Sequence, residues 1–289
     1  MISERIGSPC APRGGTTLRV VTLALFRCLL LVFLTIDSQP QFSTLAAFDY
    51  CAASKNLCQP AGARHVVCNG RRFSPACQSD PRLIKMKPAY RGLILDFHNR
   101  LRNNLACGYF RRYAEASSME QLHWDNKLAR MAEYNARTCN FAHDECRNTR
   151  KYRQVGQNLA INWFHGVNVT VPAAIDKFQR HWFQEHSRGR QKLLDRYGEQ
   201  SMRAGIGHFT QMVHADTTRV GCAMVRFRSV KQDLPVTQYY LVCNYSVGNL
   251  YERPVYRKGR RCSKCKYGCA NNGTHYRCLC STGPAQPKG

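Results

Sequence analysis

The stretch GHFTQMVHADTTRVGCAMV, residues 207–225, places two histidines ahead of a cysteine and an apolar, β-branched run. The segments RVGCAMVRFRS (219–229) and TQYYLVCNYS (237–246) are rich in β-branched and aromatic residues, which predicts two strands. His208 is then either a group with a chemical role beside these strands or a residue that fills space next to a disulfide.

An antiparallel hairpin would bring two cysteines of these strands face to face. Cys222 lies ten residues before Gln232, and Cys243 lies ten residues after Asp233, the residue that follows Gln232 at the middle of the loop. Opposed residues of such a pair have Cα atoms roughly 5 Å apart, which is within reach of a disulfide. We therefore expect Cys222 to be bonded to Cys243.

Three segments upstream of the hairpin carry apolar residues at helical spacing and are predicted to be helices: residues 90–110, 124–139 and 171–186. Asp125 is the expected N-cap of the second helix, and Pro172 suits the first turn of the third. His98 falls on the apolar stripe of the first helix. A lone histidine there is usually structural, so we leave His98 out of the site.

The amino-terminal residues 1–47 read as a secretory signal peptide. A basic leader precedes the apolar run at residues 20–36, and cleavage is expected after Ala47 rather than after Ser38. Arg27 interrupts the run, and a membrane-spanning helix needs about 20 apolar residues. A signal anchor is therefore the weaker alternative, and we expect no stable membrane span.

Charge and cysteine content indicate an extracellular protein. The chain has 289 residues and a formal charge of +25, of which +23 remains after residue 47. A secreted basic protein meets sulfated glycans and anionic lipid before nucleic acid, so we expect no nucleic-acid partner. Fourteen of the 16 cysteines follow the leader, and this even number indicates disulfides in an oxidising compartment. Structural zinc at CSKC (262–265) is the disfavoured alternative.

The exported part divides into three regions. Residues 48–80 are rich in cysteine, glycine and proline and lack periodicity, so disulfides must tie them to the rest. Residues 81–252 carry the regular structure. Residues 253–289 form a basic tail with five cysteines.

The motifs now resemble a known family. GHFTQMVHADTTRVGC and YLVCNYSVGNL are similar to the two signatures of the CAP superfamily, which includes cysteine-rich secretory proteins, venom antigen five and plant pathogenesis-related proteins. CNFAHDECRNTRKYRQVGQNLA (139–160) and the segment beginning DYC resemble the antigen-five branch of insects. Residues 81–252 would be the CAP (SCP-like) domain. The tail loosely resembles the hinge that follows this domain in some members.

The resemblance implies an α+β fold, a three-layer α-β-α sandwich with a mainly antiparallel central sheet and many disulfides. It also implies three pairings in the early part of the chain: Cys51–Cys68, Cys58–Cys146 and Cys77–Cys139. Cys107 and the five tail cysteines then allow 15 pairings, and nothing in the sequence selects among them. The sequence departs from the family at His214, where tryptophan is usual, and by one residue fewer between Tyr245 and Gly248.

The family places two histidines and two acidic residues in a central cleft. The matching residues here are His143, His208 and Glu185, with Gln157 at the second acidic position, as in antigen-five members. Gln157 cannot ionise, so only one carboxylate of the tetrad remains. Neutral His143 and His208 could bind zinc or copper, but a tight zinc site takes three or four protein ligands. The alternative for the tetrad is a buried polar network with a structural role.

We expect a secreted, non-enzymatic protein that requires no cofactor. The sequence contains neither the GxSxG serine motif nor the HExxH zinc-protease motif. The alternative is a weak metal-dependent hydrolase or protease, or a copper-dependent redox activity, at the cleft histidines. The resemblance also implies a lipid or sterol as one expected ligand, because the family includes members that carry sterols or fatty acids in an apolar groove between helices. The sequence specifies neither that ligand nor the oligomeric state.

Two further surface features are predicted. The densest basic cluster is RKGRRCSKCK in the tail, a predicted binding site for glycosaminoglycans or another anionic surface that comprises Arg257, Lys258, Arg260, Arg261, Lys264 and Lys266. Asn168 and Asn272 are predicted glycosylation sites in loops. Asn244 has the same sequon but adjoins Cys243 on a predicted strand, which should enclose it.

Overall fold

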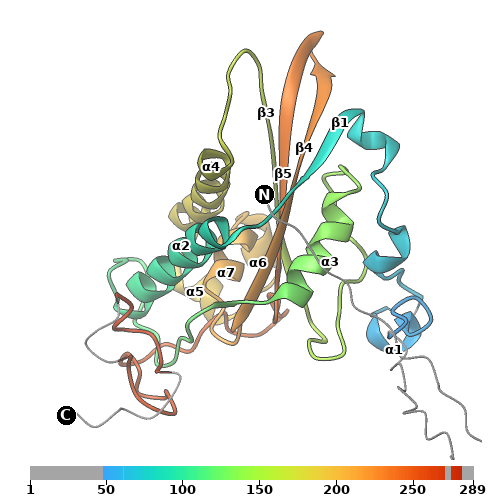
Figure 1. The fold of residues 1–289 in the computed structure, drawn as a ribbon. Coiled ribbons are helices and arrows are strands. Elements are labelled where there is room, and N and C mark those ends of the chain that lie inside the picture. The colour runs from blue at the N-terminus through green and yellow to red at the C-terminus, as the bar shows by residue number, and fades with distance from the viewer. Residues whose placement is uncertain (1–47, 61, 271–274, 282–289) are drawn as a thin grey trace, which may run out of the picture. The chain divides into compact units, whose positions relative to one another are not determined.

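A mainly antiparallel sheet lies at the centre of the protein (Figure 1). The computed structural model describes residues 48–60, 62–270 and 275–281, and the predicted leader with its cleavage position lies outside them. Within these ranges the sheet has five strands: β1 (Ser79–Ile84), β2 (His123–Trp124), β3 (Gly156–Phe164), β4 (Arg219–Lys231) and β5 (Leu234–Tyr245). The order is β1-β4-β5-β3, and β2 pairs in parallel with β4.

The β4–β5 hairpin has the register expected from the sequence. Gln232 and Asp233 form the two-residue turn with φ angles of 49° and 61°, which matches the twist of a two-residue hairpin. Cys222 faces Cys243 with their Cα atoms 4.1 Å apart, and the two are bonded. The disulfide therefore lies on the face of the hairpin that contributes to the larger core.

Helices cover both faces of the sheet, as predicted (Figure 1). α2 (Pro88–Ala106), α4 (Val171–Gln184) and α7 (Gly207–Met212) share the larger core, whose members include fully buried Ile94, Trp182 and Phe209. α3 (Asn126–Ala136) packs on the other face. The three-layer α-β-α arrangement is thus confirmed.

The helix ends follow local chemistry. Asp125 caps α3 by accepting hydrogen bonds from the N–H groups of Lys127 and Leu128, as expected, and Pro172 lies in the first turn of α4. The remaining helices are too short for apolar periodicity to predict them from the sequence. They are α1 (Ser54–Leu57), η1 (Val66–Asn69), η2 (Pro75–Cys77), η3 (Glu185–Arg188), α5 (Gln191–Asp195) and α6 (Glu199–Arg203).

Seven disulfides join the cysteines of the described residues. Four are the pairs expected from the sequence: Cys51–Cys68, Cys58–Cys146, Cys77–Cys139 and Cys222–Cys243. The sequence left the other three open, and they are Cys107–Cys278, Cys262–Cys269 and Cys265–Cys280. The expected boundary between residues 80 and 81 falls inside β1, so the early cysteine-rich segment also contributes a strand to the sheet.

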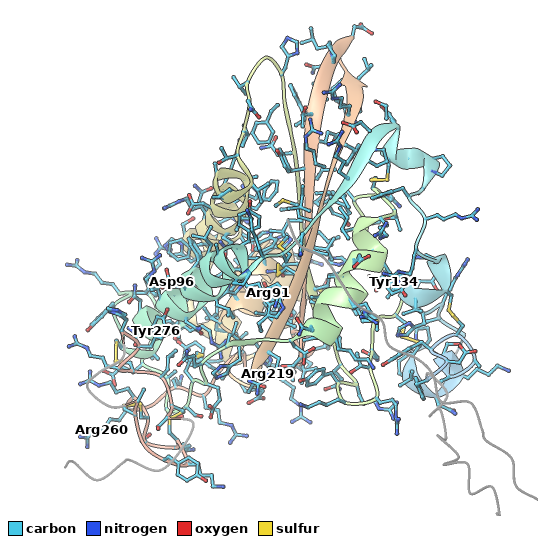
Figure 2. All side chains as sticks on the ribbon, viewed as in Figure 1. Arg91, Asp96, Tyr134, Arg219, Arg260 and Tyr276 are labelled. Carbon is cyan, nitrogen blue, oxygen red and sulfur yellow. A yellow bond between two sulfur atoms is a disulfide. The ribbon has the colours of Figure 1, made fainter. Side chains whose placement is uncertain are left out.

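The tail docks on α2. Cys107, at the end of α2, is bonded to Cys278, and the N–H of Cys278 donates to Asn103 on the same helix. The Tyr276 hydroxyl donates to Asp96, near the middle of α2, at 2.8 Å (Figure 2). Across the part of the chain that the structure describes, no helix is both long and apolar enough to cross a bilayer.

Arg102 is the most deeply buried cation of the fold. Its guanidinium donates to the carbonyl oxygens of Glu120, Met212, His214 and Thr217 at 2.8–3.2 Å. Burial lowers the pKa of Arg102 to about 9, so the group is still charged at neutral pH. It therefore binds α2 to the segment that follows α7.

The contact between α3 and β4 leaves no room for a side chain at Gly221. A Cβ there would collide with the backbone nitrogen of Ala129 and the carbonyl oxygen of Asp125. Both obstacles are backbone atoms, so the helix would have to move away from the sheet.

We predict that Gly221→Ala lowers the free energy of unfolding by about 3 kcal/mol, at the upper end of the cost of overpacking. Gly92→Ala on α2 is the control, because a Cβ there meets no atom within 4 Å. It should stabilise the helix by about 0.5–1 kcal/mol. Urea unfolding of both variants tests this, and equal effects would contradict the packing at Gly221.

Candidate functional site

Glu185 positions His208 at the junction of α4 and α7. The Nδ1 of His208 donates to Glu185 Oε1 at 2.6 Å. Glu185 Oε2 accepts from the N–H groups of His208 and Phe209 at 2.9 and 3.1 Å, at the start of α7. Glu185 is 8% exposed, so this carboxylate serves the helix and the imidazole together.

The indole ring of Trp182 packs against the imidazole ring of His208. Its ring stacks on that of His208 with centroids 6.0 Å apart, and its Nε1 donates to the carbonyl of Leu159 on β3 at 3.0 Å. Trp182 thus packs inward and Glu185 lies beside it at the site, as the helical spacing predicted.

His143 belongs to a second polar cluster. Its Nδ1 donates to Gln157 Oε1 at 2.7 Å. The Nε2 of Gln157 donates to Asp144 Oδ2 at 2.8 Å and to Asn244 Oδ1 at 3.0 Å. His143 is exposed, yet desolvation of its ring lowers its pKa, while the hydrogen bond with Gln157 opposes this. Asp144 was missed in the sequence, although it directly follows His143.

The two clusters reach β3 from its opposite faces. Gln157 lies on the face shared with α3, and its neighbour Asn158 points to the other face, where its Nδ2 donates to the His208 carbonyl at 3.1 Å. Burial is the main cause of the lowered pKa of His143, and an electrostatic interaction with His208 contributes in the same direction, so the two rings lie within electrostatic range. β3 is the last strand of the sheet, which leaves its outer edge between them.

Two cavities adjoin the tetrad. His208 lines a cavity of about 550 Å³ beside β3 and α4, together with Phe141, Leu159, Phe178 and His181. His143 lines a cavity of about 180 Å³ with Asn135 and Asp144. Phe141, two residues before His143, belongs to the lining of the larger cavity, so that cavity extends from His208 towards the His143 loop. The tetrad itself forms two hydrogen-bonded pairs, His143–Gln157 and His208–Glu185.

The arrangement offers few metal ligands. Within the described ranges no group of three or more histidine, cysteine, aspartate or glutamate side chains is placed to hold a metal ion. Both cleft histidines have Nδ1 bonded to an oxygen, and neither Nε2 has a hydrogen bond among the described residues. Metal-binding histidines usually have this pattern. His143 and His208 could thus supply two nitrogen ligands.

A third feature is a buried polar chain behind the site. His98 Nδ1 donates to the carbonyl of Ile94 at 2.8 Å, so its Nε2 accepts from the hydroxyl of Tyr245 at 2.9 Å. Asn158 Nδ2 donates to the same hydroxyl at 3.3 Å. Burial lowers the pKa of His98 to about 4, so its ring is neutral. This bonding suits the structural role expected for His98.

An apolar groove lies between α2 and α4. Its cavity of about 390 Å³ is lined by Phe97, Leu101, Phe110 and Phe183, with two exposed arginines, Arg100 and Arg180, at its sides. The ring centroids of Phe97 and Phe110 lie 6.4 and 5.8 Å from that of Phe183. The helical stripe in the sequence indicated core packing for these residues. The structure leaves part of the stripe open.

The basic tail is partly neutralised. All six residues of the predicted anionic-surface site are exposed, but Lys258 Nζ lies 2.9 Å from Asp195 and Arg261 lies 3.9 Å from Glu115. Arg260 projects from the tail (Figure 2). The sequence could not show these pairings, because both carboxylates come from distant segments.

The predicted glycosylation positions differ in accessibility. Asn168 is exposed in the loop before α4. Asn244 is fully buried and bonded to Gln157, which excludes it as an acceptor in the folded protein. Asn272 lies outside the described residues.

Comparison with known proteins identifies the family and the fold. The family described as "CAP: Cysteine-rich secretory protein family" matches residues 95–245. Venom allergen-1 of Aedes aegypti is 41% identical over 234 residues, which cover 81% of this chain and 87% of the relative. Antigen 5 like allergen Cul n 1 of Culicoides nubeculosus is 38% identical over 165 residues, 57% of this chain and 73% of the relative.

A solved structure shares the architecture. The structure described as "Crystal structure of NaASP2 with Zn2+" superposes with a TM-score of 0.54 and 26% identity. The match covers 68% of this chain and 96% of the other.

His214 makes the protein sensitive to acid. The residue is 1% exposed, and its Nδ1 has no hydrogen-bond partner among the described residues. Burial lowers its pKa to about 4 from the ordinary 6.5. The unfolded chain therefore takes up a proton near pH 6.5 while the folded chain does not, and stability falls as the pH drops from 6.5 towards 4.

Lowering the pH from 7 to 5 should reduce the free energy of unfolding of the parent. We predict that this reduction is about 2 kcal/mol smaller in His214→Phe, because one buried neutral histidine is removed. His275→Phe, at an exposed tail position, is the control. Urea unfolding at the two pH values measures the difference. The same loss in parent and His214→Phe would rule out this role for His214.

Proposed function

The chain belongs to the CAP family of cysteine-rich secretory proteins, and from this premise we propose that it is a secreted, non-enzymatic carrier of an apolar ligand with an anionic head group. The ligand occupies the groove between α2 and α4. Its chemical class is that of a fatty acid rather than a neutral sterol. Seven disulfides and the family's antigen-five members support export.

The observation that carries the proposal is the composition of the groove. Three phenylalanines and Leu101 provide an apolar floor, and 390 Å³ is within the range of small-molecule sites. Arg100 and Arg180 flank this floor, and each already holds an aspartate on its own helix, Asp96 and Asp176. A carboxylate head group could replace these exposed partners at little cost, because surface ion pairs contribute little.

The polar pairs at β3 support a non-enzymatic role. Glu185 accepts three hydrogen bonds and holds α7 in place, so it is not available as a general base without disturbing the helix. Gln157 replaces the second carboxylate and cannot carry a proton. The tetrad therefore lacks the pair of carboxylates that some acid–base enzymes use.

A groove test uses a fluorescent fatty acid and its alcohol analogue. We expect Asn104→Trp, which fills the groove, to abolish binding of both probes, because Asn104 lines the cavity. Arg100→Gln should weaken the acid about tenfold, the loss of one charge-assisted contact. The same change should leave the alcohol unaffected.

The matched control is Arg203→Gln. Arg203 is also exposed and paired with a carboxylate one helical turn away, Glu199, but it lies on α6 and does not line the groove. The affinity of the Arg203→Gln variant for the fluorescent fatty acid should equal that of the parent. Binding of the acid that survives Asn104→Trp would exclude the groove as the site.

A second function is weak zinc or copper binding by His143 and His208. The observation that favours it is the orientation of both rings, with each Nδ1 fixed and each Nε2 left for a ligand. The solved relative described with Zn²⁺ gives further support. Bound metal would supply Lewis acidity, and the residues here provide at most two nitrogen ligands and a weak site.

Calorimetric titration with Zn²⁺ should show one weak site per chain that is lost in His143→Ala and in His208→Ala. His181→Ala is the control, since His181 lines the same cavity as His208 without belonging to either pair. Zinc affinity that is unchanged in both cleft variants would refute the two-histidine site.

A further inference from the structure

A second cavity has a lining distinct from that of the tetrad and of the α2–α4 groove. It measures about 550 Å³ and is lined by Tyr50, by Asp125 and Lys127 at the start of α3, and by residues 149–152 before β3. None of these residues belongs to the tetrad or to the α2–α4 groove. The disulfide Cys58–Cys146 ties the Tyr50 segment to the loop, so the walls are held together covalently.

Positive charge outweighs negative charge in the lining of this cavity, which contains Lys127, Arg150 and Lys151 and one acidic residue, Asp125. Lys127 and Lys151 are exposed, and neither forms an ion pair among the described residues. Asp125 is the one acidic residue in its lining, and both of its oxygens are occupied. Its Oδ1 accepts from two N–H groups of α3, and its Oδ2 accepts from the hydroxyl of Tyr152 at 3.0 Å.

Aromatic rings hold the two ammonium groups in place. Lys127 Nζ lies 5.2 Å from the ring centroid of Tyr50, and Lys151 Nζ lies 5.2 Å from that of Tyr152. Each cation–π contact restricts a flexible side chain and shields one side of the charge from water. A bound anion then meets cations whose ordering cost is already reduced.

The cationic surface continues beyond the cavity. Arg153 follows Tyr152, is exposed, and donates to the carbonyl of Asn56 without a carboxylate partner among the described residues. By contrast, the tail cluster loses part of its charge to Asp195 and Glu115. The loop thus gathers cations without an ion pair among the described residues around one cavity, although the tail is the denser run in the sequence.

We propose that this cavity, formed by Tyr50, Lys127, Lys151 and Tyr152, binds one sulfated unit of an extracellular polysaccharide, with Arg153 contacting the next unit. A cavity of 550 Å³ is much larger than a single sulfate ion and lies within the size range of small-molecule sites. Two fixed cations at separate walls match an anion that carries several sulfate groups. This inference goes beyond the lipid carrier and does not depend on it.

The test measures binding of a heparin hexasaccharide by calorimetry at fixed salt. Lys127→Ala/Lys151→Ala should weaken binding about tenfold or more, as expected for the loss of charge-assisted contacts. The matched control is Lys264→Ala/Lys266→Ala in the tail, which removes the same charge, and in which Lys266 also lies over a tyrosine ring. The control should weaken binding less than about threefold, as non-specific attraction alone predicts.

Two further measurements complete the design. Lys127→Arg/Lys151→Arg keeps the charges and should bind within about threefold of the parent. The near-UV circular dichroism spectrum and the urea midpoint should be unchanged in every lysine variant, which reports that they are folded. Equal losses in the cavity and tail variants would overturn the proposal, as would an effect on phosphatidylserine vesicles without one on the hexasaccharide.

Discussion

The guanidinium of Arg102 is a charge buried completely inside the protein, and the hydrogen bonds it makes fix the segment that carries the site. It faces no carboxylate in its hydrogen bonds and instead donates to backbone carbonyls that follow α7 and to that of Glu120. The carbonyl of His214 also accepts from the N–H of Thr217. Removing Arg102 would leave some of the other carbonyls unpaired, at about 1–3 kcal/mol each. Arg102 therefore fixes the end of α7 and the segment after it, while Glu185 holds the start of α7 and His208.

The polar residues at β3 likewise each hold more than one part of the structure. Glu185 orients His208 and caps α7 at once, and Gln157 joins His143 to Asp144 and to the sheet through Asn244. Groups engaged in this way hold elements together. They leave Nε2 of each histidine as the group that faces a ligand.

The electric field near each cation of this protein depends on whether a carboxylate lies beside it. A formal charge of +25 describes the whole chain, but local fields depend on which cations face a carboxylate. Lys258 and Arg261 do, while Lys127 and Lys151 face aromatic rings. Exposed ion pairs add little stability, yet they cancel the field that would attract an anion. The surface thus separates into neutralised and uncompensated regions that net charge alone does not distinguish.

The sequence by itself determined the local parts of the structure. Apolar periodicity located α2, α3 and α4, the position of the turn located Cys222 opposite Cys243, and the capping residue Asp125 located the start of α3. These features follow from interactions between residues close in the chain, or from a register that counting can fix. The family resemblance added the early disulfides and the tetrad residues. β3 and α7, which carry Gln157 and His208, lacked a clear periodic signal.

Only the tertiary structure decided how distant segments meet. Cys107 and Cys278 are 171 residues apart, and their pairing depends on where the tail docks on α2. The two hydrogen-bonded pairs of the tetrad, the open groove beside Phe183 and the lysines that face the rings of Tyr50 and Tyr152 have the same origin. Each depends on which side chains from separate elements fill a given space, and a linear pattern does not contain that information.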